Sequence, residues 1–163
     1  MRPGETAIDP PQAKRLSPPR DFWTSNAFAW VLLFLGALLR LRQYLFNRSL
    51  WGDECMLLSN LAERSFAGLL QPLSHNQAAP PGFLFLTKTA ISAFGTSEYA
   101  LRLVPLIAGL IALFLFYKVA RRALTPGAVP IALVLFAVSE YVVYYASEIK
   151  QYETDIACAM LVY

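Results

Sequence analysis

Charge is scarce in this 163-residue chain, in which 15% of the residues are Asp, Glu, Lys or Arg and 56% are hydrophobic. A soluble domain of this length has too little interior to bury so many apolar side chains. There is one histidine, and the two cysteines are Cys55 and Cys158. None of these residues has structural-zinc spacing, and Cys158 falls inside an apolar block, so we expect neither a zinc module nor a disulfide. The composition indicates a membrane protein.

A secretory signal and a nucleic-acid-binding surface are also missing. The basic residues flank apolar blocks and form no basic groove interleaved with aromatic side chains, so nucleic acid is not an expected partner. Residues 1–23 are polar, basic and rich in proline. The apolar stretch that follows is too long for a signal sequence and has no clear cleavage site. We therefore predict a disordered basic leader over 1–23 that stays on the cytoplasmic side.

Long apolar blocks, by contrast, are abundant. Three of them, at about 27–46, 101–120 and 129–145, approach the roughly 20 residues that a membrane span needs. Arg40, near the far end of the first block, can snorkel to the interface or meet phosphate. A fourth block begins at Ile156, and the chain ends within it. We expect an all-α, polytopic transmembrane fold with about three complete spans and the start of a fourth, in a fragment of a longer protein.

The charges between the apolar blocks predict how the spans are oriented. Basic residues favour the cytoplasmic side, so Lys118, Arg121 and Arg122 should lie inside, together with the leader. This arrangement requires that 47–80 forms an external loop and that the short apolar block 83–94 does not cross the bilayer. We therefore predict a multi-pass protein of the plasma (inner) membrane with a cytoplasmic N-terminus.

The predicted external loop holds the acidic residues Asp53 and Glu54, next to Trp51. Apolar residues at near-helical spacing over 53–65 predict an amphipathic helix on the membrane surface. A carboxylate at this position can act as a general base or hold a divalent cation near phosphate. Alternatively, Asp53 caps the surface helix and Glu54 favours its first turn. Spacing alone does not separate these two interpretations.

Further candidate residues share the predicted external side. Lys150 and Tyr152 can contact a lipid phosphate, and Asp155 can add a second acidic group. His75 can be a metal ligand or a phosphate contact, and Arg102 can meet phosphate at the start of a span. For each there is also a simpler interpretation, in which the residue belongs to an ordinary charged loop or, for Arg102, snorkels to the interface.

The order of these features resembles the start of the protein O-mannosyltransferase-like glycosyltransferases of the GT-C group, to which the lipid A aminoarabinose transferase is related. The features are a basic leader, one span, Trp51-Gly52-Asp53-Glu54, a loop from His75 to Pro80-Pro81, Phe94-Gly95-Thr96-Ser97-Glu98 followed by Arg102, and Tyr145 to Tyr152. The resemblance implies that 24–163 is the N-terminal part of such a transmembrane domain. It also implies a sugar donor carried on a polyprenyl phosphate at the external face.

The resemblance assigns roles to particular residues. Asp53 matches the expected catalytic base, and Glu54 matches its acidic neighbour. Asp155 matches an acidic position in the second external loop, with Lys150 and Tyr152 in the segment before it. Ala78-Ala79 stand where some relatives have a charged pair, so the participation of a divalent metal ion stays open.

We therefore expect a glycosyltransferase that moves a hexosyl or pentosyl group from a lipid-linked donor to an acceptor by inverting displacement, with Asp53 as the base. The acceptor can be a protein, a lipid or a glycan, and the bilayer is the other partner. We expect the fragment alone to be inactive, because about three spans cannot enclose the donor. Two alternatives stay open, a transporter or channel segment and a non-catalytic membrane subunit.

Overall fold

The computed structural model describes residues 22–163, and within this range it contains helices and no strand. In chain order the elements are η1 (Phe22–Thr24), α1 (Asn26–Leu45), α2 (Gly52–Glu63), η2 (Gly68–Leu70), η3 (Ser74–Asn76), α3 (Pro81–Phe94), α4 (Glu98–Ala123), α5 (Ala128–Val138), α6 (Glu140–Tyr145) and α7 (Tyr152–Val162). The all-α prediction is confirmed for this part of the chain. The predicted leader lies outside the described residues, except for Phe22 and Trp23 in η1.

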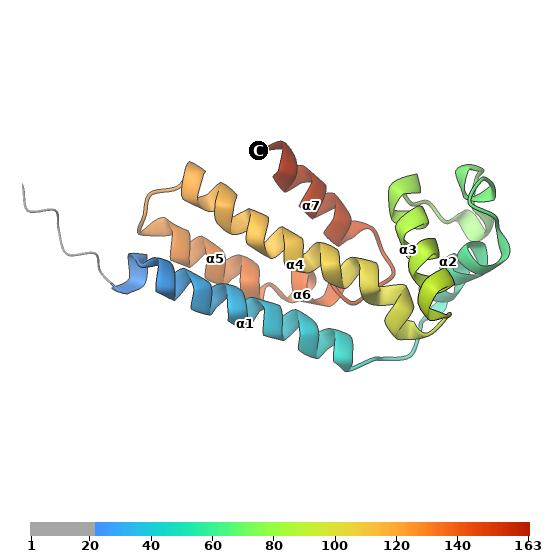
Figure 1. Ribbon diagram of the computed structural model, residues 1–163, viewed down its shortest axis with the longest axis horizontal. Helices are drawn as coiled ribbons and strands as arrows, with labels where there is room; N and C mark the ends of the chain where they lie inside the picture. Colours follow the sequence, from blue (N-terminus) through green and yellow to red (C-terminus); the bar gives the residue numbers. More distant parts are fainter. Residues whose placement is uncertain (1–21) are drawn as a thin grey trace, which may run out of the picture.

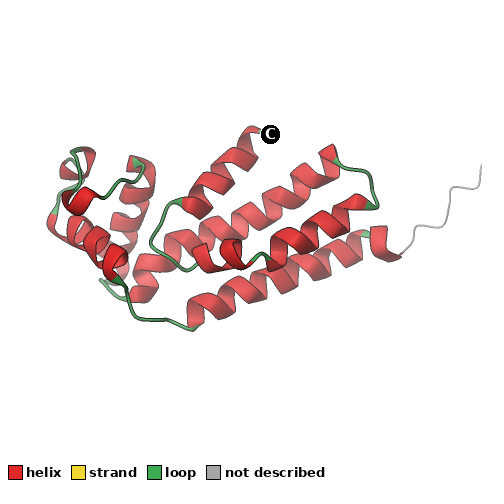
Figure 2. Ribbon diagram, turned by 180° about the vertical axis from the view of Figure 1, so that it is seen from behind, coloured by secondary structure: helices red, strands yellow, loops and turns green. Residues whose placement is uncertain are grey.

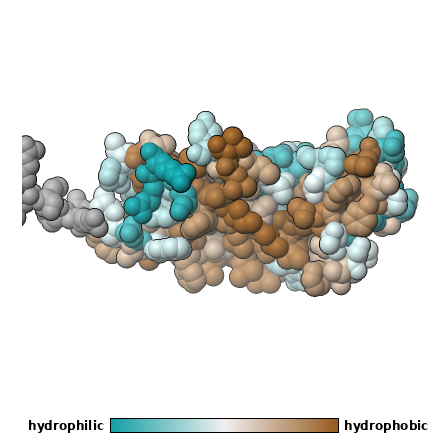
Figure 3. Space-filling model, turned by 45° about the horizontal axis from the view of Figure 1, so that its top comes forward, coloured by the Kyte–Doolittle hydropathy of each residue, from teal (hydrophilic) through white to brown (hydrophobic). Residues whose placement is uncertain are grey.

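The helices form an elongated bundle with a smaller group of helices at one end (Figures 1 and 2). Helices α1, α4 and α5 run side by side, α7 packs against α4, and α2 and α3 lie where α4 begins. On the face drawn in Figure 3, hydrophobic side chains cover most of the middle and hydrophilic ones gather toward the two ends. This distribution is typical of a bundle whose middle lies in a bilayer.

Helices α1 and α4 are long and apolar enough to cross a membrane. Each begins after a serine, Ser25 or Ser97, whose hydroxyl accepts a hydrogen bond from a backbone N–H of the first turn at 3.2 and 3.3 Å. At 1.5 Å per residue, α1 is about 30 Å long and α4 about 39 Å. The predicted spans at 27–46 and 101–120 are thus confirmed as long apolar helices.

The third predicted span, 129–145, is not one continuous helix, which corrects the sequence-based expectation. Ser139, with φ −55° and ψ 118°, separates α5 from α6. A helix end leaves carbonyl groups without their usual N–H partners. One of them, that of Ala137, accepts a hydrogen bond at 3.3 Å from the buried guanidinium of Arg40 in α1. Arg40 thus points into the bundle, where it stabilises the break, and it does not snorkel to the interface.

The short apolar block 83–94 forms α3, which is about 21 Å long and so shorter than the roughly 30 Å of a bilayer's hydrocarbon core. Helix α3 packs against α2 and α4. These contacts build an apolar core whose buried members are Leu57, Leu61, Leu69, Phe83, Leu84, Ile91, Ala100, Leu101 and Ile149. Its helical length favours a helix that does not cross the bilayer, and this topology stays a prediction.

Two glycines allow the long helices to approach closely. A Cβ atom on Gly36 of α1 would lie 2.9 Å from Leu113 of α4, and one on Gly109 of α4 would lie 2.9 Å from the Cβ of Ala146. Real Cβ atoms essentially never lie this close to other atoms, so a larger residue at either position requires the neighbouring groups to shift. The contact at Gly109 holds the segment that follows α6 against α4, and this segment leads into the candidate site.

Candidate functional site

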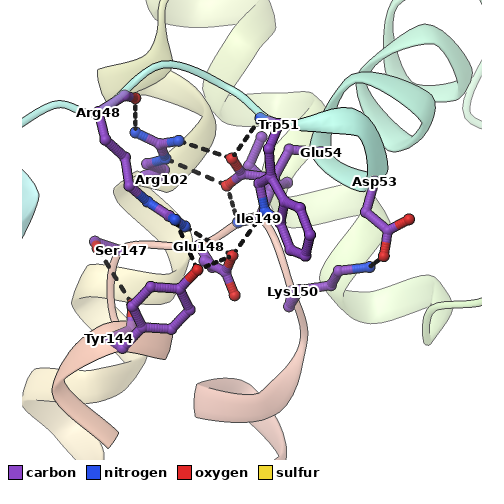
Figure 4. A network of polar contacts seen from close by, with 10 residues as sticks. All are labelled: Arg48, Trp51, Asp53, Glu54, Arg102, Tyr144, Ser147, Glu148, Ile149 and Lys150. Atoms are coloured by element: carbon purple, nitrogen blue, oxygen red, sulfur yellow. Dashed lines mark hydrogen bonds and ion pairs between the residues drawn. The ribbon is translucent and has the colours of Figure 1, made fainter. Parts of the chain in front are cut away.

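A network of polar contacts joins the chain before and at the start of α2 to the segment between α6 and α7 (Figure 4). Two carboxylates, Glu54 and Glu148, organise the network, and both are at most 1% exposed. Each has one local partner and others from segments 48 to 100 residues away in the chain. The network therefore sets how the two segments lie relative to one another.

Glu54 is fully buried and uses both carboxylate oxygens within the protein. Arg102 of α4 donates to it through Nη2 at 2.8 Å and Nε at 3.4 Å. The backbone N–H of Ile149 donates to it at 3.1 Å, and that of Trp51 at 3.4 Å. A buried charge is tolerated only when it is paired and hydrogen-bonded. Glu54 thus joins α2, α4 and the segment before α7.

Glu148 is the centre of the second half of the network. Its Oε1 accepts hydrogen bonds from Arg48 at 2.7 Å, from the indole of Trp51 at 2.9 Å and from the hydroxyl of Tyr144 at 3.0 Å. Burial alone would lower the pKa of Arg48, but its hydrogen bonds to Glu148 and Tyr144 outweigh burial and raise the pKa above its usual value. The Arg48 side chain therefore remains a cation.

Asp53 lies outside this buried network. Its carboxylate receives a 3.1 Å ion pair from Lys150, and its side chain is 49% exposed. Figure 4 shows the pair beside the Glu54 cluster, with one carboxylate oxygen of Asp53 free of the contacts drawn. The interpretation that Asp53 caps the helix is wrong, because the N-cap residue is Trp51 and the side chain that bonds the cap N–H is that of Glu54.

An open cavity of about 340 Å³ lies over the Asp53–Lys150 pair. It is lined by Asp53, Met56, His75, Asn76, Gln77, Ala78, Lys150, Gln151 and Tyr152. Four residues singled out from the sequence, Asp53, His75, Lys150 and Tyr152, thus line one cavity. The number of predicted spans places the segments around Asp53 and Lys150 on the same side of the membrane. The contact between Asp53 and Lys150 agrees with this prediction.

The wall of the cavity formed by η3 has an unusual backbone. His75 and Asn76 both have positive φ angles, 60° and 54°. Residues other than glycine seldom occupy this backbone region. The buried side chain of Asn60 in α2 holds this turn through hydrogen bonds to the N–H and C=O of Ser74 at 2.8 and 3.3 Å. Strain of this kind persists only where surrounding contacts impose it, and it clusters at functional sites.

The remaining predicted site residues do not line this cavity. Glu54 and Arg102 pair with each other in the buried network. Asp155 is exposed on α7 and lies outside the cavity. The residues predicted from the sequence thus divide into those that line the cavity, the pair Glu54 and Arg102 that supports its walls, and Asp155, which does neither.

No motif in the sequence predicted a chemical role for Arg48, Tyr144 or Glu148. One signal could have found the ion pair between Arg48 and Glu148: two opposite charges follow two apolar blocks whose ends are predicted on the same side. Nothing in the sequence indicated the contribution of the Trp51 indole, because aromatic residues at membrane interfaces are common.

A second unexpected feature lies deeper in the bundle. Glu153 of α7 is fully buried beside Gly109, and both of its oxygens lack a hydrogen-bond partner in the described part of the chain. Arg40 is also fully buried, its Nε and Nη2 find no hydrogen-bond partner among residues 22–163, and the two charges act on each other electrostatically. Glu140, at the start of α6, is exposed by contrast.

The described residues provide few ligands for a divalent metal ion. They contain no group of three or more His, Cys, Asp or Glu side chains arranged to hold one. Hard cations prefer several oxygen ligands, whereas the cavity has one carboxylate, Asp53, whose partner is the ammonium of Lys150. A single carboxylate that is already paired with an ammonium is a poor ligand set for such an ion.

Comparison with known proteins identifies the family. The family model described as dolichyl-phosphate-mannose-protein mannosyltransferase matches residues 78–163, just over half of the chain. The match includes Arg102, Lys150 and Tyr152, whereas Asp53 and His75 precede it. No curated protein and no solved structure matches the chain. The matched half and the resemblance seen in the order of the motifs agree, and the chain belongs to the dolichyl-phosphate-mannose-protein mannosyltransferase family, whose members are membrane glycosyltransferases.

Proposed function

We propose that this protein transfers a sugar from a polyprenyl-phosphate donor to an acceptor at the external face of the plasma membrane, with Asp53 as the general base. Membership of the family supports glycosyl transfer and a lipid-phosphate-linked donor. The donor, the side of the membrane and the role of Asp53 are the parts that we add.

The observation that carries the proposal is the environment of Asp53. Glu54 and Glu148 are buried, whereas the side chain of Asp53 is 49% exposed and lines the cavity that Lys150, Tyr152 and His75 share. A general base must reach the proton that it removes. Glu54 cannot approach an acceptor, because it is 0% exposed and both of its oxygens accept internal hydrogen bonds.

The proposed reaction is a single displacement. Asp53 removes the proton from an acceptor hydroxyl or amine while the acceptor atom attacks the anomeric carbon of the sugar. The bond between that carbon and the phosphate oxygen breaks, the configuration inverts, and polyprenyl phosphate leaves as an anion. The ammonium of Lys150 and the hydroxyl of Tyr152 line the same cavity and can stabilise the negative charge that develops on the leaving oxygen.

Glu54 and Arg102 have a positioning role in this proposal. Glu54 follows Asp53 in α2 and bonds the backbone N–H of Ile149, the residue before Lys150. One buried carboxylate therefore sets the distance between the base and the cation. Arg102 neutralises that carboxylate and also donates to the carbonyl of Arg48 at 2.7 Å.

The test is Asp53→Asn in the intact gene product, assayed with a radiolabelled polyprenyl-phosphate sugar in membranes. Asparagine keeps the shape and loses the base, so transfer should fall by about 10² to 10⁴-fold, the usual contribution of general base catalysis. The amount of protein inserted into membranes should not change, because the side chain is half exposed.

The matched control is Glu63→Gln, which removes an exposed carboxylate from the other end of the same helix. It should retain activity close to that of the unmodified protein. Near-normal transfer by Asp53→Asn would contradict the assignment of the base.

A further inference from the structure

The end of the bundle far from the candidate site carries positive charge that no acidic side chain of residues 22–163 pairs with. Lys118, Arg121 and Arg122 lie exposed toward the end of α4. The three ion pairs among the described residues all lie at the other end of the bundle and include none of these cations. Arg121 donates to two uncharged acceptors, the Asn26 side chain at 3.0 Å and the Tyr117 hydroxyl at 3.1 Å. An anion that neutralises this end must therefore come from outside residues 22–163.

A hollow of about 440 Å³ lies between the start of α1 and the end of α4. It is lined by Asn26, Trp30, Phe114, Tyr117, Lys118, Arg121 and Arg122. The lining contains three cations and no carboxylate. The Lys118 ammonium lies 5.9 Å from the centre of the Phe114 ring, so the cationic group and the aromatic wall form one surface.

A second hollow, of about 300 Å³, continues from the first along the groove between α1 and α4. The two share Trp30 and Phe114, whose rings stack at 6.3 Å. Beyond them every lining side chain is apolar: Leu33, Phe34, Ala37, Leu110 and Leu113. Along α1 the groove runs about 10 Å from Trp30 toward the middle of the helix. A cationic hollow followed by an apolar groove fits an amphiphile with an anionic head.

We propose that this groove binds an anionic phospholipid, with its phosphate at the cations of α4 and an acyl chain against Trp30 and Phe34. The preference of basic residues for one side of the membrane accounts for the charges but not for the groove that leads from them. A polyprenyl-phosphate donor is a poorer fit, because α4 is about 39 Å long and the phosphate would lie at the opposite end from Asp53. The inference does not depend on the proposed reaction.

Quenching of Trp30 fluorescence by brominated lipids tests this site. The reporter is the full chain with Trp23→Phe and Trp51→Phe, which leaves Trp30 as its one tryptophan, in phosphatidylcholine vesicles. Either brominated phosphatidylglycerol or brominated phosphatidylcholine is added at the same low mole fraction. We expect the anionic lipid to quench at several-fold lower mole fraction than the zwitterionic one. Lys118→Gln/Arg122→Gln should abolish this preference, since each cation near an anionic surface contributes about fivefold.

The matched control is Arg42→Gln, which removes an exposed cation of α1 outside both hollows and should leave the preference unchanged. A second variant, Ala37→Phe, should reduce quenching by both lipids because it fills the apolar groove without altering charge. Equal quenching by the two lipids, or a preference that survives loss of Lys118 and Arg122, would overturn the proposal. Loss of the preference in Arg42→Gln as well would reveal only nonspecific attraction to the surface and would also overturn it.

Discussion

Asp53 and Glu54 are neighbours in the sequence and carry the same charge, yet the structure surrounds them differently. Asp53 is half exposed beside a cavity, whereas Glu54 is fully buried between Arg102 and two backbone N–H groups. Their positions in the first turn of α2 explain the difference, because consecutive helical residues point about 100° apart. The same substitution at the two positions should therefore affect different properties.

We predict that Glu54→Gln lowers the stability of the fold by about 3–5 kcal/mol, because it leaves the 2%-exposed side chain of Arg102 as an unpaired buried charge. Thermal unfolding in detergent measures the effect. Lys150→Gln, which breaks the more exposed pair with Asp53, should change stability by no more than about 1 kcal/mol. Equal stability losses in the two variants would show that the Glu54–Arg102 pair does not anchor α2.

At the scale of the elements, the packing of α7 against α4 determines where Lys150 and Tyr152 lie, because α7 begins at Tyr152. Gly109 permits this close approach, and Glu153 fills the space beside it. The buried charge of Arg40 in α1 is the charge that acts on Glu153. Two distant helices are thus coupled electrostatically through the interior of the bundle.

We predict that Arg40→Met and Glu153→Gln each destabilise the protein, and that the double variant is less destabilised than the sum of the two by at least about 1 kcal/mol. Either single change leaves one buried charge uncompensated, whereas the double change removes both. A double-mutant cycle followed by thermal unfolding in detergent measures this coupling. The control cycle combines Arg42→Met, at an exposed arginine of α1, with Glu153→Gln, and its two effects should be additive. Additivity in the first cycle would mean that the two buried charges do not interact.

At the scale of the whole molecule, the candidate site and the cations Lys118, Arg121 and Arg122 lie at opposite ends of the bundle. Arg121 donates a hydrogen bond to Asn26 at the start of α1, whereas Lys150 donates one to Asp53, which follows the end of α1 in the chain. The two long apolar helices lie between these ends. If the bundle crosses the membrane, the two ends face different compartments.

We predict that Cys55, an exposed residue of α2, reacts with a membrane-impermeant maleimide added outside intact cells, in a Cys158→Ser background. A Cys55→Ser/Cys158→Ser protein with Ala123→Cys at the end of α4 should react only after the membrane is permeabilised. Labelling in the reverse pattern would invert the proposed orientation. Labelling of both positions in intact cells would mean that α4 does not cross the bilayer.

The sequence by itself determined the helical class, the two long apolar helices and the short helix near 53–65, because these depend on local hydrophobic periodicity and on length. It also singled out Asp53, His75, Lys150 and Tyr152, since polar residues next to apolar blocks are conspicuous. The family followed from the order of short motifs, and the match over 78–163 confirmed it.

Only the tertiary structure decided which of the candidate residues share a cavity and which support it. Glu54 differs from Asp53 through contacts with Arg102 and Ile149, which are about 50 and 95 residues away in the chain. The break at Ser139, which the hydropathy of 129–145 does not indicate, is stabilised by Arg40 from another helix. Burial and pairing of charges depend on neighbours brought together by folding, and no local pattern of residues records those neighbours.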